Sequence, residues 1–186
     1  MAPGLRKLVL TAHITSSVGW LGAVAGFLAV ALAARSSQDE PTMRAAYITM
    51  ESMTRYAIVP LSVTSLVIGI LQSLASPWGL FRHYWVVVKL VMTIFAVVFL
   101  LQYTRTMSVI ASAATDTTMS SVDLRALGTS PLLHAAGALV ILLVTTILAV
   151  YKPRGMTRYG WRRRAASLTA SSSRRAASSS SIRPSR

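Results

Sequence analysis

The sequence predicts an all-α protein, a transmembrane four-helix bundle followed by a disordered basic C-terminal tail. The mean hydropathy is +0.55 and only 13% of the 186 residues are charged, whereas a soluble domain carries about 25% charged residues. Four apolar stretches are each long enough to cross ~30 Å of hydrocarbon as a helix of about 20 residues. A segment rich in Arg and Ser follows them and predicts the tail.

The predicted spans cover about residues 8–34, 56–76, 85–103 and 132–151. Their backbone is expected to be helical, because each unpaired amide in lipid costs several kcal/mol. The first span is too long for a secretory signal, whose apolar region runs about 7–15 residues, so we expect it to be retained as a helix. The four spans form one predicted domain, residues 1–154.

Local signals refine the second span and the last connection. A helical lead-in, Ala45–Arg55, precedes the second span. Pro60 lacks a backbone N–H and is expected to kink that helix. The polar connection Arg105–Pro131 is expected to contain a short helix near Ser121–Leu127.

The distribution of basic residues predicts the orientation. With both termini inside, the cytoplasmic side holds 13 Lys and Arg residues, ten of them after Val150, and the outer loops hold four. Cytoplasmic loops of membrane proteins carry the excess of Lys and Arg. We therefore expect a multi-pass protein of the inner (plasma) membrane with both termini in the cytoplasm.

Residues 155–186 are predicted to form a disordered cytoplasmic tail. No apolar periodicity remains there, so the segment cannot bury enough surface to fold. Its arginines favour anionic lipid headgroups, at about 1 kcal/mol per basic residue near the surface. Nucleic acid is the less favoured partner, because no aromatic residue follows Trp161 to stack on bases.

Composition argues against several kinds of site. The absence of cysteine rules out disulfides, thiolate metal sites and a cysteine nucleophile. With only five Asp and Glu residues, a carboxylate metal cage or a paired acid and base is not expected. Glycine-rich nucleotide loops and the His-Glu-x-x-His motif are absent. The sequence therefore favours a protein that is not an enzyme.

Two titratable residues within the spans mark a candidate site. Lys89 is the only formally charged residue well inside a span, where a lysine costs ~2.5–3.5 kcal/mol on insertion scales. His13 lies at the same predicted depth, ~7.5 Å from the inner face, with Trp20 on the same helical face. Both side chains would then bind a cofactor or an anion between the helices. Alternatively, Lys89 snorkels to the interface and His13 hydrogen-bonds to a neighbouring helix.

A haem b site would draw on further residues near the inner face. His134 is predicted near the outer face, about 20 Å from His13 along the membrane normal, so one iron cannot bind both. His83, beside Arg82, is the only other histidine that could share a haem with His13. The candidate site therefore has His13 as axial ligand and Lys89, Arg82 and His83 as second ligand or propionate partners.

Methionines gather near the predicted outer face. Met50 and Met53 lie there with His134, and thioether and imidazole ligands suit Cu(I). A copper site is thus an alternative, although methionine is also an ordinary filler of helix ends. Separately, glycines at positions 19, 22 and 26 form a stripe that favours close helix packing, either within the bundle or in a homo-oligomer.

Three short motifs follow one another along the chain: His13-x6-Trp20-x-Gly22, Pro60-x8-Gly69 and Trp85-x3-Lys89-Leu90. On these motifs, residues 5–155 resemble a family of bacterial four-helix integral membrane proteins of unassigned activity. That family is distantly similar to a superfamily that includes the membrane domain of the copper-resistance protein CopD and the haem-containing protoporphyrinogen oxidase HemJ. The resemblance implies the four-helix fold, makes His13 a haem-site candidate and makes Lys89 a second ligand or functional partner.

The chain also departs from these relatives. HemJ-like chains carry further histidines and a charged stretch where this chain has Phe27-Leu28-Ala29-Val30, and CopD-like proteins have more helices. Three functional hypotheses follow. The protein is a haem b-binding or redox-related membrane protein, a copper-handling membrane protein, or a non-catalytic scaffold or accessory subunit of a membrane partner.

Overall fold

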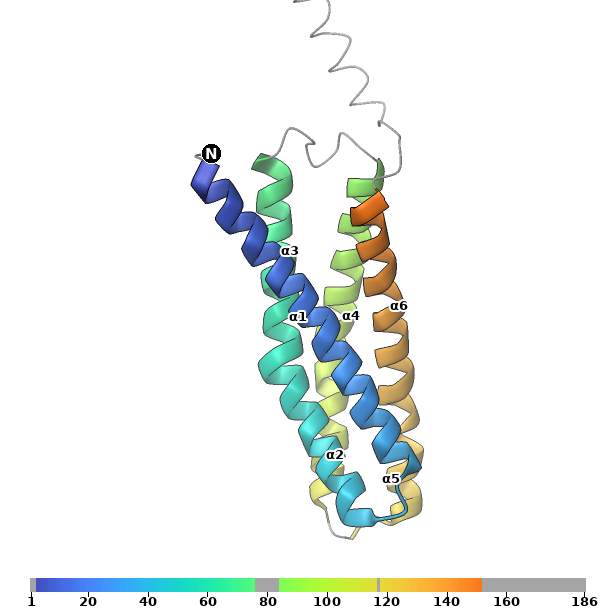
Figure 1. Ribbon diagram of the computed structural model, residues 1–186. Coiled ribbons are helices and arrows are strands. Elements are labelled where there is room, and N and C mark those ends of the chain that lie inside the picture. Colours follow the sequence, from blue (N-terminus) through green and yellow to red (C-terminus); the bar gives the residue numbers. More distant parts are fainter. Residues whose placement is uncertain (1–2, 76–83, 117, 152–186) are drawn as a thin grey trace, which may run out of the picture.

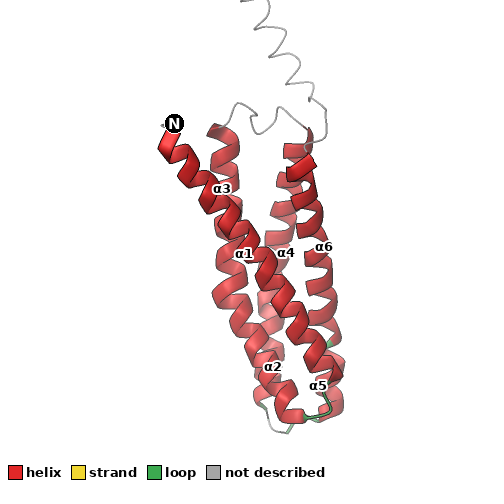
Figure 2. Ribbon diagram, in the orientation of Figure 1, coloured by secondary structure: helices red, strands yellow, loops and turns green. Residues whose placement is uncertain are grey.

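The predicted all-α transmembrane bundle is confirmed by a computed structural model, which describes residues 3–75, 84–116 and 118–151. Within these ranges every regular element is a helix (Figures 1 and 2). Four helical segments are long and apolar enough to cross a membrane, as expected of a multi-pass membrane protein. The predicted tail, residues 155–186, lies outside the described residues.

The bundle has two distinct ends. In chain order the helices are α1 (Pro3–Ser36), α2 (Glu40–Met53), the π-helix η1 (Thr54–Ile58), α3 (Val59–Ala75), α4 (Tyr84–Thr115), α5 (Ser121–Leu127) and α6 (Thr129–Tyr151). The start of α1, the end of α3, the start of α4 and the end of α6 lie together at what we call the terminal end (Figure 1). The opposite end, which carries the short helix, is called the α5 end.

The helices extend beyond the predicted spans. The lead-in and the second span form one continuous helical segment, α2–η1–α3. The third span was predicted to end near residue 103, but α4 continues to Thr115, so much of the expected polar connection is helical. The short helix predicted at Ser121–Leu127 is confirmed as α5. Its N-cap is Ser120, whose side chain accepts a hydrogen bond from the backbone N–H of Asp123.

Pro60 is accommodated by the π-helix that precedes it. Proline has no N–H, and its ring crowds the carbonyl of the residue four positions earlier. In η1 the backbone hydrogen bond spans five residues instead of four, and the N–H of Val59 bonds to the carbonyl of Thr54. The wider turn brings Thr54 and Ile58 into the bundle, where both are buried. The expected local distortion at Pro60 thus takes the form of a π-helix within a continuous helical rod.

The exposed side chains of α4 change in character along the helix. From Tyr84 to Leu101 the exposed positions are chiefly apolar or aromatic, and further along they include Arg105, Ser108 and Ser112. Eighteen helical residues rise about 27 Å, close to the ~30 Å thickness of the hydrocarbon layer. This part of α4 is therefore long and apolar enough to cross the hydrocarbon layer by itself.

The tightly packed core lies towards the α5 end. Buried residues recur every three or four positions along three helices, as expected for faces that meet in a bundle. They include Val24, Phe27 and Ala31 in α1, Met43, Tyr47 and Met50 in α2, and Tyr103, Met107 and Ile110 in α4. Leu124 of α5 covers this core and is fully buried. Fewer residues are buried near the terminal end, where a cavity of about 600 Å³ lies.

Candidate functional site

His13 lies where α1 contacts α3. A Cβ atom at position 69 would lie 3.0 Å from Cε1 and 3.5 Å from Nδ1 of His13, so only glycine lets the ring lie so close to α3. One turn further along, Ser17 Oγ and Ser65 Oγ are 2.7 Å apart and share a hydrogen bond. Small residues on both helices therefore fix the position of the imidazole.

A cavity of about 600 Å³ opens beside this imidazole, between α1, α3, α4 and α6. His13 and Lys89 both line it, as does Trp20, which is only 3% exposed. The structure thus places the predicted imidazole and ammonium at one cavity. The other side chains with polar atoms that line the cavity are Arg6, Ser17, Ser65, Gln72, Ser73, Trp85, Thr93, Thr145 and Thr146.

The lining is cationic. Arg6 and Lys89 carry positive charge, and no Asp or Glu lines the cavity among the described residues. In the described part of the chain the ion pairs are Arg44–Glu40 and Arg55–Glu51, so neither cavity cation has a carboxylate partner there. Arg6 is exposed, but Lys89 is partly buried, and a cation away from water needs a counter-charge. The cavity is therefore suited to an anion.

His13 is an under-satisfied polar group. Its Nδ1 is buried and makes no hydrogen bond with any described group. An unpaired buried polar atom costs about 1–3 kcal/mol. Leu66, Leu90 and Leu142 contribute apolar walls to the same cavity. The arrangement combines an imidazole, two cations and an apolar interior, the features that an amphipathic anion requires.

Arg82 and His83, the other predicted members of the haem site, lie outside the described residues. Besides Lys89, the cation that lines the cavity is Arg6, which the sequence interpretation missed. A signal for it existed, because Arg6, His13 and Trp20 are spaced by seven residues and lie on one face of a helix. Gln72, Thr145 and Thr146 carried no comparable signal, because their approach depends on how the helices cross.

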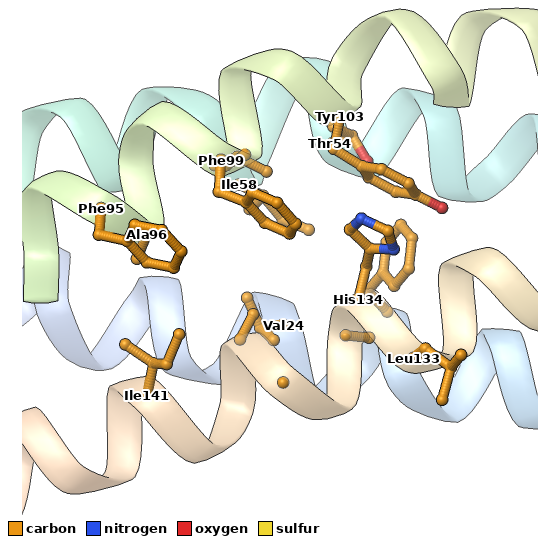
Figure 3. A pocket seen from close by; sticks show the side chains of 15 residues that line it. Val24, Thr54, Ile58, Phe95, Ala96, Phe99, Tyr103, Leu133, His134 and Ile141 are labelled. Carbon is orange, nitrogen blue, oxygen red and sulfur yellow. The ribbon is translucent and has the colours of Figure 1, made fainter.

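The predicted copper residues do not line a common cavity. Met50 is fully buried in the core, and Met53 packs against the same core with its methyl group beside Gly26. His134 lines a second, smaller cavity, and neither methionine does so (Figure 3). No cluster of three His, Cys, Asp or Glu side chains occurs in the described ranges. Nothing in this arrangement favours the copper hypothesis.

Comparison of the chain with protein-family models, with curated proteins and with solved structures finds no match. The resemblance to the CopD and HemJ superfamily therefore stays a prediction.

Proposed function

We propose that this protein is a membrane-embedded binding protein for an amphipathic anion, and that the anion is haem b. The observation that supports this proposal is the cavity that gathers His13, Lys89 and Arg6 without a lining carboxylate among the described residues. Each of these groups matches one part of a haem. Imidazole is the commonest protein ligand of haem iron, and two cations match two propionates.

The size and lining of the cavity agree with this proposal. Cofactor and ligand pockets are about 300–1,000 Å³ and mostly apolar, with a few polar groups that fix orientation. His13 would hold the iron, Lys89 and Arg6 would bind the propionates, and Trp20 would border the macrocycle. When bound, the haem would supply a one-electron redox centre within the bilayer. The protein would exclude water from the group and fix its orientation.

The proposal extends to orientation. The terminal end carries Arg6 and Lys7 at its start and leads into the basic residues after Val150, whereas few uncompensated cations lie at the α5 end. By the excess of positive charge, the terminal end faces the cytoplasm across the plasma membrane. The cavity then lies in the cytoplasmic half of the bundle.

The test is a pair of titrations of the detergent-purified full chain, one with hemin and one with iron-free protoporphyrin IX. Both probes carry the same ring and carboxylates, so their difference in affinity reports the contact with iron. We expect a Soret shift on hemin binding and tighter binding of hemin than of protoporphyrin. His13→Ala should remove this preference, and Lys89→Gln should weaken both probes about tenfold.

Lys7→Gln is the matched control, since Lys7 is an exposed neighbouring cation that does not line the cavity. It should leave both affinities unchanged. Equal binding of the two probes would overturn the haem assignment and leave an anion site without iron ligation. If neither probe binds, the proposed function is wrong.

A further inference from the structure

A second cavity, of about 270 Å³, lies nearer the α5 end between α4 and α6 (Figure 3). Residues of α1 and η1 form its back wall. Among the side chains that line it, only Thr54, Tyr103 and His134 carry polar atoms. Thr54 donates its hydroxyl to the carbonyl of Met50 at 2.8 Å, and the Tyr103 hydroxyl pairs with Ser130 Oγ at 3.3 Å. Two of the three polar groups are therefore satisfied.

His134 presents the remaining polar atom. Its Nδ1 lies 2.9 Å from the carbonyl oxygen of Ser130. A carbonyl only accepts, so Nδ1 must carry the hydrogen, and Nε2 of the neutral ring is left with a lone pair. No described residue makes a hydrogen bond with Nε2. With the neutral ring, the cavity contains one fixed hydrogen-bond acceptor, and no Asp, Glu, Lys or Arg side chain lines it.

Aromatic rings hold this acceptor in place. The imidazole stacks on Tyr103, with ring centroids 3.8 Å apart, and on Phe99 at 5.1 Å. Phe99 in turn stacks on Phe95 at 5.7 Å, so a row of rings follows α4 away from His134 (Figure 3). Because three contacts restrict the ring, Nε2 cannot turn away from the cavity at little cost.

The cavity has the polarity gradient of a lipid molecule. Tyr103 lies where the apolar belt of α4 ends, and Ile141 lines the cavity seven residues, or about 10 Å, beyond His134 along α6. Phe95, Phe99 and Leu133, which line the cavity, are 57%, 51% and 65% exposed, so it opens towards the surrounding lipid. A molecule can thus enter sideways with its polar head at the level of His134.

We propose that this cavity binds an uncharged membrane lipid whose head carries a hydroxyl group, and that the hydroxyl donates a hydrogen bond to Nε2 of His134. A quinol and a diacylglycerol both have this chemistry. A quinone has the same ring and tail as its quinol but offers only acceptors, so it cannot make this bond. The proposal is independent of the haem assignment, which concerns the other cavity.

Equilibrium dialysis of the detergent-purified full chain at pH 8 tests this proposal. The probes are a short-chain ubiquinol kept reduced, the matching ubiquinone and dioctanoylglycerol. We expect at least one of the two hydroxyl-bearing probes to bind about fivefold more tightly than the quinone, the effect of one hydrogen bond. The probe that binds more tightly identifies the source of the hydroxyl. This comparison needs no variant.

His134→Phe keeps an aromatic ring but removes the acceptor, and it should abolish the preference for the hydroxyl-bearing probe. Tyr151→Phe is the control, since Tyr151 is exposed at the far end of α6 and does not line the cavity, and it should retain that preference. Equal affinities for all probes in the unaltered protein, or binding of none, overturn the proposal. Retention of the preference in His134→Phe overturns it as well.

Discussion

Position 69 shows how the absence of one side chain shapes the larger cavity. Gly69 faces His13 so closely that an added Cβ would lie 3.0 Å from the ring. Gly22, by contrast, has no heavy atom within 4 Å of an added Cβ. Gly22 and Gly69 belong to the same pair of packed helices, α1 and α3, but only Gly69 faces the His13 ring.

We expect Gly69→Ala to displace His13 and to lower the affinity for hemin, because the ring must shift to make room for the methyl group. Overpacking of this kind costs about 1–3 kcal/mol. Gly22→Ala should leave hemin affinity unchanged and the melting temperature equal or slightly higher, since alanine favours a helix. Hemin titration and thermal unfolding in detergent measure both effects. An unaltered site in Gly69→Ala would contradict the packing described for His13.

Asp116 controls the turn that follows α4. Its carboxylate accepts hydrogen bonds from the Thr118 hydroxyl at 2.7 Å and from the Thr118 N–H at 2.9 Å. These bonds, the hydroxyl first, lower the pKa of Asp116 below its ordinary value. A carboxyl group with a lowered pKa stabilises the fold above its unfolded pKa of about 3.9, and this contribution is lost as the pH falls through the folded pKa.

Asp116→Ala should therefore lower the melting temperature at neutral pH, and the difference from the unaltered protein should shrink as the pH falls below about 4. Thermal unfolding between pH 7 and pH 3 measures this. Thr118→Val, which removes the donating hydroxyl, should reproduce part of the same pH dependence. A difference that persists unchanged at pH 3 would show that the charge of Asp116 is not responsible.

At the level of elements, Arg44 joins α2 to the end of α4 and the loop beyond it. Its guanidinium donates hydrogen bonds to the carbonyls of Ala114 at 2.9 Å, Asp116 at 2.7 Å and Met119 at 2.8 Å. It also forms an ion pair with Glu40 at 2.7 Å. The Arg44 side chain is only 14% exposed, and its bonds to the carbonyls of Ala114 and Met119 are partly buried. One side chain thus satisfies one carbonyl in the last turn of α4 and two in the loop that follows.

Arg44→Gln should destabilise the bundle by about 2–3 kcal/mol, because hydrogen bonds from a charged group are the strong ones and the carbonyls would lose their donor. Arg105→Gln is the control, since Arg105 is exposed and should change stability by no more than about 0.5 kcal/mol. Chemical denaturation in mixed micelles gives both values. Equal effects of the two substitutions would rule out a special role for Arg44.

At the level of the whole molecule, the bundle divides into a tightly packed half and a hollow half. The core of Met43, Tyr47, Met50 and Met107 lies towards the α5 end and is fully or almost fully buried. The cavity of about 600 Å³ lies towards the terminal end. The packed half can therefore supply the rigidity that keeps the helices of the hollow half in position.

The absence of cysteine allows the membrane boundary to be tested directly. Val98 and Ser112 are both exposed on α4, but we place only Val98 within the hydrocarbon layer. In intact cells a membrane-impermeant maleimide should label Ser112→Cys and should leave Val98→Cys unlabelled. After solubilisation and unfolding, both should react. Labelling of Val98→Cys in intact cells would place the boundary elsewhere, and protection of Ser112→Cys would contradict the proposed orientation.

Much of the architecture could be predicted because its signals are local. In lipid every backbone amide must be paired within its own segment, so an apolar stretch of about 20 residues is sufficient to predict a helix. The short helix at residues 121–127 was predictable for the same reason, because its cap and charge pattern lie within a few residues. The extension of α4 to Thr115 was not predicted, because the polar residues exposed on its last turns have the composition of a loop.

The sequence by itself determined that the chain is an all-helical membrane bundle. It also identified His13 and Lys89 as titratable residues within the spans, where a polar or charged group is costly. Only the tertiary structure decided that both line one cavity with Arg6, that Gly69 contacts the imidazole, and that His134 faces a separate apolar cavity. Hydrophobicity and backbone pairing act along the chain, so they can be recognised in a single segment. Cavities arise from the crossing of helices that are distant in sequence, and no single segment records where they cross.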